Sequence, residues 1–347
     1  MSNQKTNQLR LIAETAFHHQ GEVDFLKKLV SSVINQSKAD IVKFHLLLDL
    51  DAYMASDHVI YNQVKNWIFD KSVWREVIEE VNSSEKELML LFNDTESIKF
   101  GISFQPTIVE IHSVCLNDLR LLNTLKYYLD DKIKVVLGVG GSDLYEIENA
   151  INILQHPNII LMFGFQNFPT IYQNVNFTKI RRIMQMFPDF EFGYADHTAW
   201  NDHDNILITL LGAALGMDYL EKHVTIAYGE ERIDWSSAVS IEMFNEIKEK
   251  SDILQACNGD GLLHLNQGER DYSIFGPMKK AALLKCNVNA GEKFSMEMVS
   301  FKRTSQISDL SQVEVLQSEG RLFTKDVSAG KVISRAYLEI DKSGKLK

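Results

Sequence analysis

Short apolar runs alternate with longer amphipathic stretches along most of the chain. Each run is rich in β-branched or aromatic residues and is bounded by turn-forming residues, a pattern that predicts a β-strand. Eight such runs occur, at residues 9–16, 40–46, 87–92, 107–113, 133–139, 158–164, 191–196 and 218–225.

Apolar residues recur at helical spacing in the stretches between the runs. These stretches are residues 23–34, 72–81, 116–129, 143–154, 177–187, 206–216 and 241–254. Ser142 and Asp143 provide a cap for the helix that starts there. Eight strand–helix units in about 255 residues fit a (β/α)₈ TIM barrel. A doubly wound open sheet is the alternative, because the pattern alone does not show that a sheet closes.

The pattern changes after about residue 265, where long helical periodicity ends. Residues 287–294 (NVNAGEKF) and 325–333 (KDVSAGKVI) repeat a strand, an Ala-Gly turn, a lysine and an apolar residue, which predicts a small β-rich domain built on a pseudo-repeat of turns. The expected division is a barrel over 1–268, a linker over 269–278 and the small domain over 279–347.

Charge and cysteine content narrow the class of protein. The 347 residues carry a formal net charge of −11, which argues against nucleic acid or an anionic membrane as a partner. The three cysteines, Cys115, Cys257 and Cys286, are far apart, so neither a disulfide framework nor a cysteine zinc site is expected. The sequence shows no apolar leader and no membrane-spanning stretch, so we expect a cytoplasmic protein.

Polar residues gather at the ends of the predicted strands, where a TIM barrel carries its catalytic groups. Six of the ten histidines are among them, namely His18, His19, His45, His112, His197 and His223. The end positions singled out here are Glu14, His18, His19, Lys43, His112, Ser113, Gly140, Ser142, Gln166, Asn167, His197 and His223.

His197 and His223 end neighbouring predicted strands, so their imidazoles can share a divalent cation, although a rim histidine beside a satisfied interior one is the alternative. Lys43 needs a partner for its charge, either a substrate phosphate or carboxylate, or an internal Glu14 or Glu110. Residues 138–142 (GVGGS) offer backbone N–H groups that suit a phosphate, but they serve a tight turn equally well.

Several segments resemble the sialic acid synthase family. They are AETAFHHQG at 13–21, ADIVKFH at 39–45, GYADHTAWND at 193–202 and LGMDYLEKHVTI at 215–226. The region 285–338 resembles the antifreeze-like SAF domain that follows the barrel in that family. The resemblance spans nearly the whole chain and implies a TIM-barrel enzyme with an appended SAF domain.

The resemblance implies a role for six residues. His197 and His223 would hold a divalent metal, with Mn²⁺ expected and Mg²⁺ or Co²⁺ as alternatives, and the metal would activate the aldehyde of an N-acetylated amino sugar. Glu14 would orient that sugar.

The remaining three positions concern the donor, the sugar and a second subunit. Lys43 would contact the phosphate of phosphoenolpyruvate, and Asp234 would line the sugar site. Arg303 would reach into the partner subunit's active site in a domain-swapped homodimer.

Other positions depart from the family's pattern. Glu110 replaces a phosphate-site lysine, while Gly138 and Ala195 replace serines. The replacements nearby remain polar, which indicates a rebuilt donor site. We place His112, Ser113, Gly140, Ser142, Gln166 and Asn167 there, with His18, His19 or His112 available for proton transfer.

The leading hypothesis is therefore a condensation of phosphoenolpyruvate with an N-acetylated amino-sugar aldehyde, giving a sialic-acid-like nonulosonic acid for surface polysaccharides. A metal-dependent aldolase or lyase that uses an unphosphorylated keto acid is the first alternative. A catalytically silent homologue that binds a sugar is the second.

Overall fold

The first eight strands form a closed barrel in the computed structural model, which describes residues 9–164 and 167–339. Each strand is parallel to the next, and β8 returns to pair with β1, with Glu14 opposite His223. The closure confirms the predicted TIM barrel and rules out the open doubly wound sheet. The strands are β1 (Arg10–Glu14), β2 (Ile41–Leu46), β3 (Glu87–Phe92), β4 (Ile108–Ile111), β5 (Lys134–Gly138), β6 (Ile159–Phe163), β7 (Glu191–Ala195) and β8 (Tyr219–Thr225).

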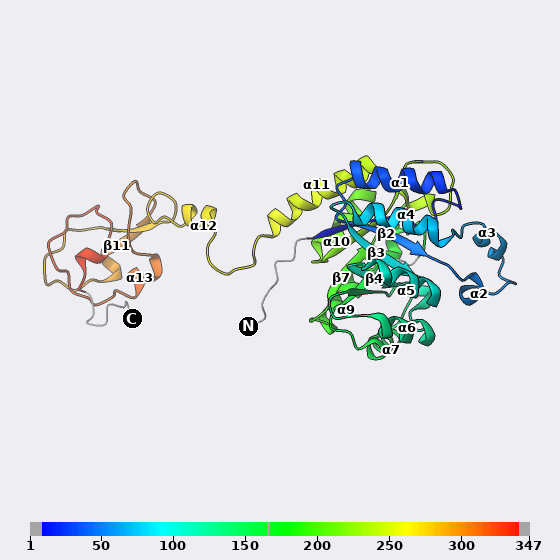
Figure 1. Cartoon of the computed structure of the whole chain (residues 1–347). Helices are drawn as coiled ribbons and strands as arrows, with labels where there is room; N and C mark the ends of the chain where they lie inside the picture. Colours follow the sequence, from blue (N-terminus) through cyan, green and yellow to red (C-terminus); the bar gives the residue numbers. More distant parts are fainter. Residues whose placement is uncertain (1–8, 165–166, 340–347) are drawn as a thin grey trace. The chain divides into compact units, whose positions relative to one another are not determined.

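Helices surround the barrel, as Figure 1 shows, and all seven predicted helical stretches are confirmed. They are α1 (Val23–Gln36), α4 (Lys71–Asn82), α6 (Leu119–Tyr128), α7 (Leu144–Leu154), α9 (Phe177–Met186), α10 (Asn205–Ala214) and α11 (Ile241–Asn258). Helix α5 (Thr95–Gly101) was not predicted, because it is short. Among the helices that the structure describes, none is both long and apolar enough to cross a membrane.

The barrel interior changes character from bottom to top, because alternate residues of a strand face the same side. A lower layer is apolar and includes Ile12, Ile41 and Ile108. Two residues further along the same strands stand Glu14, Lys43 and Glu110, all buried. The pattern that builds the core therefore also delivers charged side chains to the barrel mouth.

A long segment between β2 and α4 contributes to the barrel mouth. It contains the short helices α2 (Leu50–Tyr53) and α3 (Tyr61–Lys65), which are fixed by their own apolar cluster of Leu47, Leu50, Val64 and Trp67. Two further short elements are α8 (Tyr172–Val175) and β9 (Val239–Ser240), which extends the sheet beside β8.

A second compact unit begins at Gly261 and contains α12 (Gln267–Tyr272), β10 (Ala281–Leu284), β11 (Val299–Lys302) and α13 (Gln312–Leu316). Its core is separate and includes Phe294 and Phe323.

The pseudo-repeat predicted for this small unit is confirmed in its hydrogen bonds. Val288 and Val327 exchange two backbone hydrogen bonds of 3.0 Å, so the two copies face each other. The N–H of Ala290 donates to Asp326 while that of Ala329 donates to Asn287, each at 2.8 Å. The two halves therefore stabilise each other by equivalent contacts.

Candidate active site

A cavity of about 600 Å³ lies at the mouth of the barrel. It is lined from β1, β2, β4, β5, β6, β7 and β8, the segment between β2 and α4, and the segment after β8. Seven residues singled out from the sequence line it together: Glu14, Lys43, His112, Ser113, His197, His223 and Asp234. The structure therefore brings these strand-end residues, far apart in sequence, to one site.

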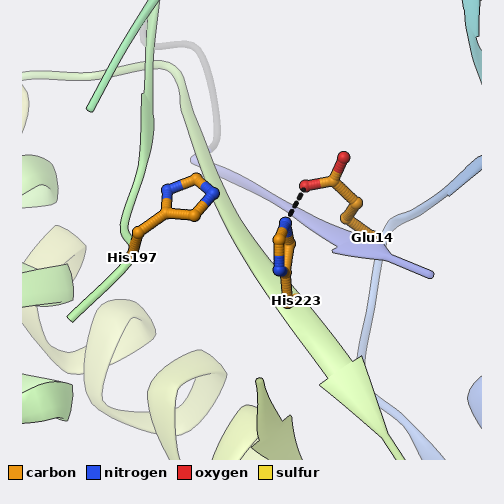
Figure 2. Close-up of side chains that lie close together, drawn as sticks. All are labelled: Glu14, His197 and His223. Carbon is orange, nitrogen blue, oxygen red and sulfur yellow. Dashed lines mark ion pairs between the residues drawn. The ribbon is translucent and has the colours of Figure 1, made fainter. Parts of the chain in front are cut away.

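Glu14, His197 and His223 form a cluster that could hold a metal ion. One ligating atom from each lies within 4.8 Å of the others, and all three side chains are buried. Figure 2 shows the two imidazoles beside the Glu14 carboxylate; Glu14 Oε2 lies 2.9 Å from His223 Nε2. Two histidines and one carboxylate are a donor set that suits a divalent transition metal with open positions.

Hydrogen bonding fixes which nitrogen of His197 faces the cluster. Its Nδ1 donates to the carbonyl oxygen of Ala195 at 3.0 Å, so Nε2 is the atom that would ligate a metal. Burial, followed by the proximity of His223, lowers the pKa of His197 to about 3, so the ring is neutral as a metal ligand must be. Burial lowers the pKa of His223 as well, but the Glu14 carboxylate outweighs it and raises that pKa overall.

A buried ion pair lies directly behind the two histidines. Asp196 precedes His197 and Lys222 precedes His223, so both side chains point away from the barrel interior. Lys222 Nζ lies 2.8 Å from Asp196 Oδ2. The second oxygen of Asp196 accepts from the Thr198 backbone at 3.2 Å and its hydroxyl at 2.7 Å. The pair therefore ties β7 to β8 at the level of the histidines.

Lys43 is surrounded by three buried carboxylates, which are its partners in the structure. Its Nζ lies 3.1 Å from Glu14, 2.7 Å from Glu110 and 2.9 Å from Glu221. Of the two options, the internal ion pair is the one the structure contains. Burial lowers the pKa of Lys43, but the three carboxylates raise it further, so the lysine stays charged.

Three acidic side chains surround the single Lys43, and this surplus of acidic groups favours a bound cation nearby. Burial raises the pKa of Glu14, but Lys43 and His223 bring it well below its ordinary value. Burial and the neighbouring Glu14 carboxylate raise the pKa of Glu221 well above its own. Three buried carboxylates beside one lysine are costly unless some are protonated or a further positive charge is present. The donor set and the charge balance both fit a divalent cation.

His18 and His19 lie under the mouth and not on the cavity surface. His19 packs against Phe69 with ring centroids 4.5 Å apart, and its Nδ1 accepts from the Gly21 backbone at 3.1 Å. Burial lowers the pKa of each histidine to about 3. Their contacts therefore support the loop that follows β1.

His112, by contrast, lines the cavity. It is half-buried and lies beside His45, with ring centroids 5.9 Å apart. Burial, followed by the proximity of His45, lowers the pKa of His112 to about 3, so its ring is neutral at physiological pH. A neutral imidazole at the cavity wall can donate or accept one hydrogen bond from a bound molecule.

Gly140, Ser142 and Asn167 do not line the cavity, and Gln166 lies outside the described residues. At the start of α7, Asp143 accepts from the Glu146 backbone and Glu146 accepts from the Asp143 backbone, each at 2.9 Å. The glycine-rich turn leads into this helix N-terminus, where backbone N–H groups could bind a phosphate. The carboxylates of Asp143 and Glu146 already accept hydrogen bonds from backbone N–H groups there.

Arg303 belongs to the second unit, where its guanidinium donates to the carbonyl of Pro277 and remains exposed.

Further residues of the site had no role assigned from the sequence. Glu221 lies two residues before His223 on β8, and His45 lies two residues after Lys43 on β2. Residues two apart face the same side of a strand, so this spacing was the signal in the sequence that Glu221 and His45 also belong to the site. The segment between β2 and α4 adds Tyr53 and Trp67 to the lining. Its length was the only sign, because long loops at a barrel mouth commonly serve the site.

Comparison with known proteins identifies the family. The family model described as "NeuB family" matches residues 29–262, more than half of the chain. This chain belongs to the NeuB family. His197 and His223 lie within the matched stretch, whereas Glu14 precedes it. The family places the chain among enzymes that form carbon–carbon bonds in sugar-acid biosynthesis.

Similar proteins extend over nearly the full chain. An N,N'-diacetyllegionaminic acid synthase from Campylobacter jejuni is 27% identical over 345 residues, covering 93% of this chain and 98% of its own. An uncharacterized protein from Methanocaldococcus jannaschii is 29% identical over 309 residues, covering 84% of each chain. Among solved structures, the crystal structure of an N-acetylneuraminic acid synthetase from Leptospira borgpetersenii matches with a TM-score of 0.69 at 21% identity. The match covers 78% of this chain and 94% of that chain.

Proposed function

We propose that this chain joins a three-carbon pyruvyl unit to the aldehyde carbon of an N-acetylated amino sugar, giving a sialic-acid-like nonulosonic acid. The observation that carries the proposal is the cluster of Glu14, His197 and His223 at the wall of the cavity. The NeuB family and the name of the legionaminic acid synthase relative support the reaction class.

The three residues of the cluster would hold a divalent metal, with Mn²⁺ expected and Mg²⁺ or Co²⁺ as alternatives. Such an ion supplies Lewis-acid polarisation of a carbonyl. Glu14 would also orient the sugar through the oxygen that faces Lys43. The Asp196–Lys222 pair would keep both imidazoles in place while the substrates bind.

The residues that line the cavity divide between the two proposed substrates. Asp234 lines it and is anchored by accepting from the Phe17 backbone at 3.3 Å, so its carboxylate is available at a fixed position for sugar hydroxyl or amide groups. Trp67 and Trp235 also line the cavity and offer apolar faces for an acetamido group. Donor residues would be Lys43, His112 and Ser113, from β2 and the segment after β4.

The donor is either phosphoenolpyruvate, which the resemblance to the sialic acid synthases implies, or an unphosphorylated keto acid. With phosphoenolpyruvate the products are the nonulosonic acid and phosphate, and a water is consumed. With a keto acid only a carbon–carbon bond forms, and no phosphate appears. Phosphate release therefore separates the two donors directly.

The test is a product assay with the full chain, Mn²⁺ and a panel of N-acetylhexosamines, with each donor in turn. Mass spectrometry would detect the nonulosonic acid, and phosphate release would be followed in parallel. We expect a sugar-dependent product that disappears in His197→Ala. No product with any sugar and either donor, from a chain that binds metal, would overturn the proposal.

We also propose that the active unit is a homodimer in which Arg303 of one copy serves the cavity of the other. Support comes from the resemblance and from the exposed position of the Arg303 guanidinium. Mixing an inactive Arg303→Ala chain with an inactive His197→Ala chain tests this. Activity recovered on mixing is expected, whereas two variants that stay inactive together would contradict it.

A further inference from the structure

The segment between β2 and α4, residues 47–70, forms a largely apolar part of the cavity wall. Five of its side chains that line the cavity are apolar or aromatic: Tyr53, Met54, Ile60, Val64 and Trp67. Phe17 and Ile233, from the loops after β1 and β8, also line the cavity and pack against the apolar cluster that fixes α2 and α3. The apolar surface is therefore continuous across three parts of the chain.

Close packing fixes this wall against the loop after β1. Gly21 has a φ of +84°, and a Cβ placed on it would overlap the backbone carbonyl oxygen of Asn66. The rings of Phe17 and Trp67 lie 5.6 Å apart between their centroids. Because the loop and the end of the segment form one packed unit, the apolar wall is in place before a substrate binds.

The wall adjoins the residue proposed to bind the sugar. The N–H of Phe17 donates to Asp234 Oδ2 at 3.3 Å, and Ile233 directly precedes Asp234 in the chain. The ring of Phe17 lies 5.3 Å from that of His45 between centroids, and His45 contacts Glu14 in turn. One imidazole thus separates the wall from the cation cluster. The part of the acceptor that faces the wall is therefore not the aldehyde but the carbons remote from it.

Hydroxyl groups on those remote carbons would not match the wall. The N-acetyl group of the proposed acceptor would use the faces of Trp67 and Trp235, which leaves Met54 and Ile60. Neither of these two side chains provides a strong hydrogen-bonding group. A hydroxyl buried against them loses its hydrogen bonds to water, whereas a methyl group there gains from burial.

Gln63 adds an amide to the same wall. It lies one helical turn after Ile60, to whose carbonyl oxygen its backbone N–H donates at 3.0 Å, and its side chain lines the cavity. Residues three apart at the start of a helix are neighbours on its surface. The amide of Gln63 can both donate and accept a hydrogen bond, as a second amide requires. An acetamido group offers an amide for Gln63 and a methyl for the apolar side chains beside it.

We propose that Met54, Ile60 and Gln63 select the acceptor by binding apolar substituents at the end of the sugar remote from the aldehyde. These substituents are a methyl group in place of the terminal hydroxymethyl group and a second acetamido group in place of a hydroxyl. The inference rests on the proposed function and deepens it. The substituents do not react, so the bond that forms is the one already described.

Four acceptors with the same 2-acetamido group test this subsite. They are N-acetylmannosamine, its 6-deoxy form, its 4-acetamido-4-deoxy form and the sugar with both changes. Steady-state rates with the full chain, Mn²⁺ and whichever donor gives product yield kcat/KM for each. One buried methyl group improves affinity about fourfold, so the doubly changed sugar should be preferred over N-acetylmannosamine by about tenfold or more. The gain should appear in KM, because the substituents lie away from the reacting carbon.

Variants of the segment assign the preference to its residues. Met54→Gln combined with Ile60→Gln removes apolar surface at similar side-chain length and should reduce the preference by about threefold or more. Gln63→Met should lower the preference only for the two sugars with a second acetamido group. Val59→Gln is the matched control, because Val59 is 94% exposed and does not line the cavity, and it should leave all four values unchanged.

Thermal melting would show that each variant folds. Ile60 is exposed, so Ile60→Gln alone decides the matter if the double variant does not fold.

Two results would overturn this inference. One is a wild type that uses N-acetylmannosamine as well as the doubly changed sugar. The other is a folded Met54→Gln, Ile60→Gln chain that keeps the wild-type preference. Absence of product with every acceptor would instead remove the proposed function. Calorimetry with the alditols of the four sugars, which lack the aldehyde and cannot react, then judges the subsite. A doubly changed alditol that binds no more tightly than that of N-acetylmannosamine would overturn it.

Discussion

The two sides of the barrel mouth are built for opposite charges. On one side, β1, β7 and β8 present Glu14, His197 and His223, three groups that attract a cation. On the other side, β2 and β4 present Lys43 and Glu110, where the one positive charge is already matched. Both sides are built in the same way, from every second residue of a strand facing the barrel interior. The two sides therefore differ only in which residue types occupy these inward-facing positions.

The difference teaches that a cation site and an anion site are supported in different ways. The cation side has an ion pair behind it, Asp196 with Lys222, that holds two neighbouring strands. The donor side is held by ion pairs within the site itself, around Lys43. Because the Asp196–Lys222 pair lies outside the site, it leaves the two histidines able to bind a ligand. The ion pairs of Lys43 lie inside the site, so they neutralise the positive charge that an anion would need.

The largest effect is expected from breaking the pair behind the cation side. Asp196→Asn leaves Lys222 buried without a carboxylate, which should lower the free energy of unfolding by about 3–5 kcal/mol. Chemical denaturation of the barrel transition measures this. A double variant, Asp196→Asn with Lys222→Met, removes the unpaired charge and should recover part of the loss. Equal losses in the single and double variants would show that the pair does not act as argued.

His223→Ala should affect chemistry more than stability. Removal of this proposed cation ligand is expected to lower turnover by about 100-fold or more, because the substrate carbonyl would lose the ion proposed to polarise it. Ser113→Ala, on the opposite wall, is the comparison and should cost less than about tenfold, since a serine contributes one hydrogen bond. Steady-state rates with saturating metal measure both. Equal losses of turnover in His223→Ala and Ser113→Ala would contradict the proposed difference between the two sides of the mouth.

The histidines beneath the mouth predict how stability depends on pH. Their pKa values in the folded chain are about 3, below the ordinary 6.5, so the unfolded chain binds more protons between these values. Stability is therefore complete above pH 6.5 and is lost as the pH falls. Each of His18 and His19 should contribute a loss of about 2 kcal/mol between pH 7 and pH 5.

His19→Leu is the variant that tests this dependence. It cannot titrate, so its free energy of unfolding should fall less steeply with pH than that of the wild type in metal-free buffer. Denaturation at pH 7 and pH 5 gives the comparison. A slope unchanged by the substitution would mean that His19 is not buried in its neutral form.

The smallest effect is expected at the start of α7, on the donor side. Asp143→Ala removes one half of a capping box and should lower stability by about 1 kcal/mol. Because Asp143 caps its own helix and does not line the cavity, metal affinity and turnover should stay at wild-type values. A large loss of turnover would instead show that this helix N-terminus takes part in substrate binding.

The fold was predictable because strand and helix periods differ so clearly in this chain. Runs such as 133–139 and 158–164 are short and apolar on both faces, as strands buried between a core and helices must be. In the sequence, only the count of eight strands favoured a closed barrel over an open sheet. The contacts between Glu14 and His223 that prove closure join residues more than 200 positions apart.

The site was predictable only in part, because position along a strand indicates burial but not partners. The pairing of His197 with His223 followed from their place at neighbouring strand ends. Glu14 and Glu110 were among the partners expected for Lys43, and both contacts are confirmed. Glu221 was not expected, since β8 is far from β2 in the sequence and the distance from Glu221 to Lys43 depends on the closure of the barrel. His18 and His19 share the strand-end position but do not line the cavity, because His18 packs against Phe25 and His19 against Phe69.

The most direct test of the account is electron paramagnetic resonance of the full chain titrated with Mn²⁺. The account predicts one bound Mn²⁺ per chain, with a spectrum that shows coupling to two imidazole nitrogens. Glu14→Gln should weaken this binding, and His197→Ala should remove the coupling to one nitrogen. A chain that binds no Mn²⁺, or binds it with no nitrogen coupling, would contradict the claim that Glu14, His197 and His223 form the functional cation site.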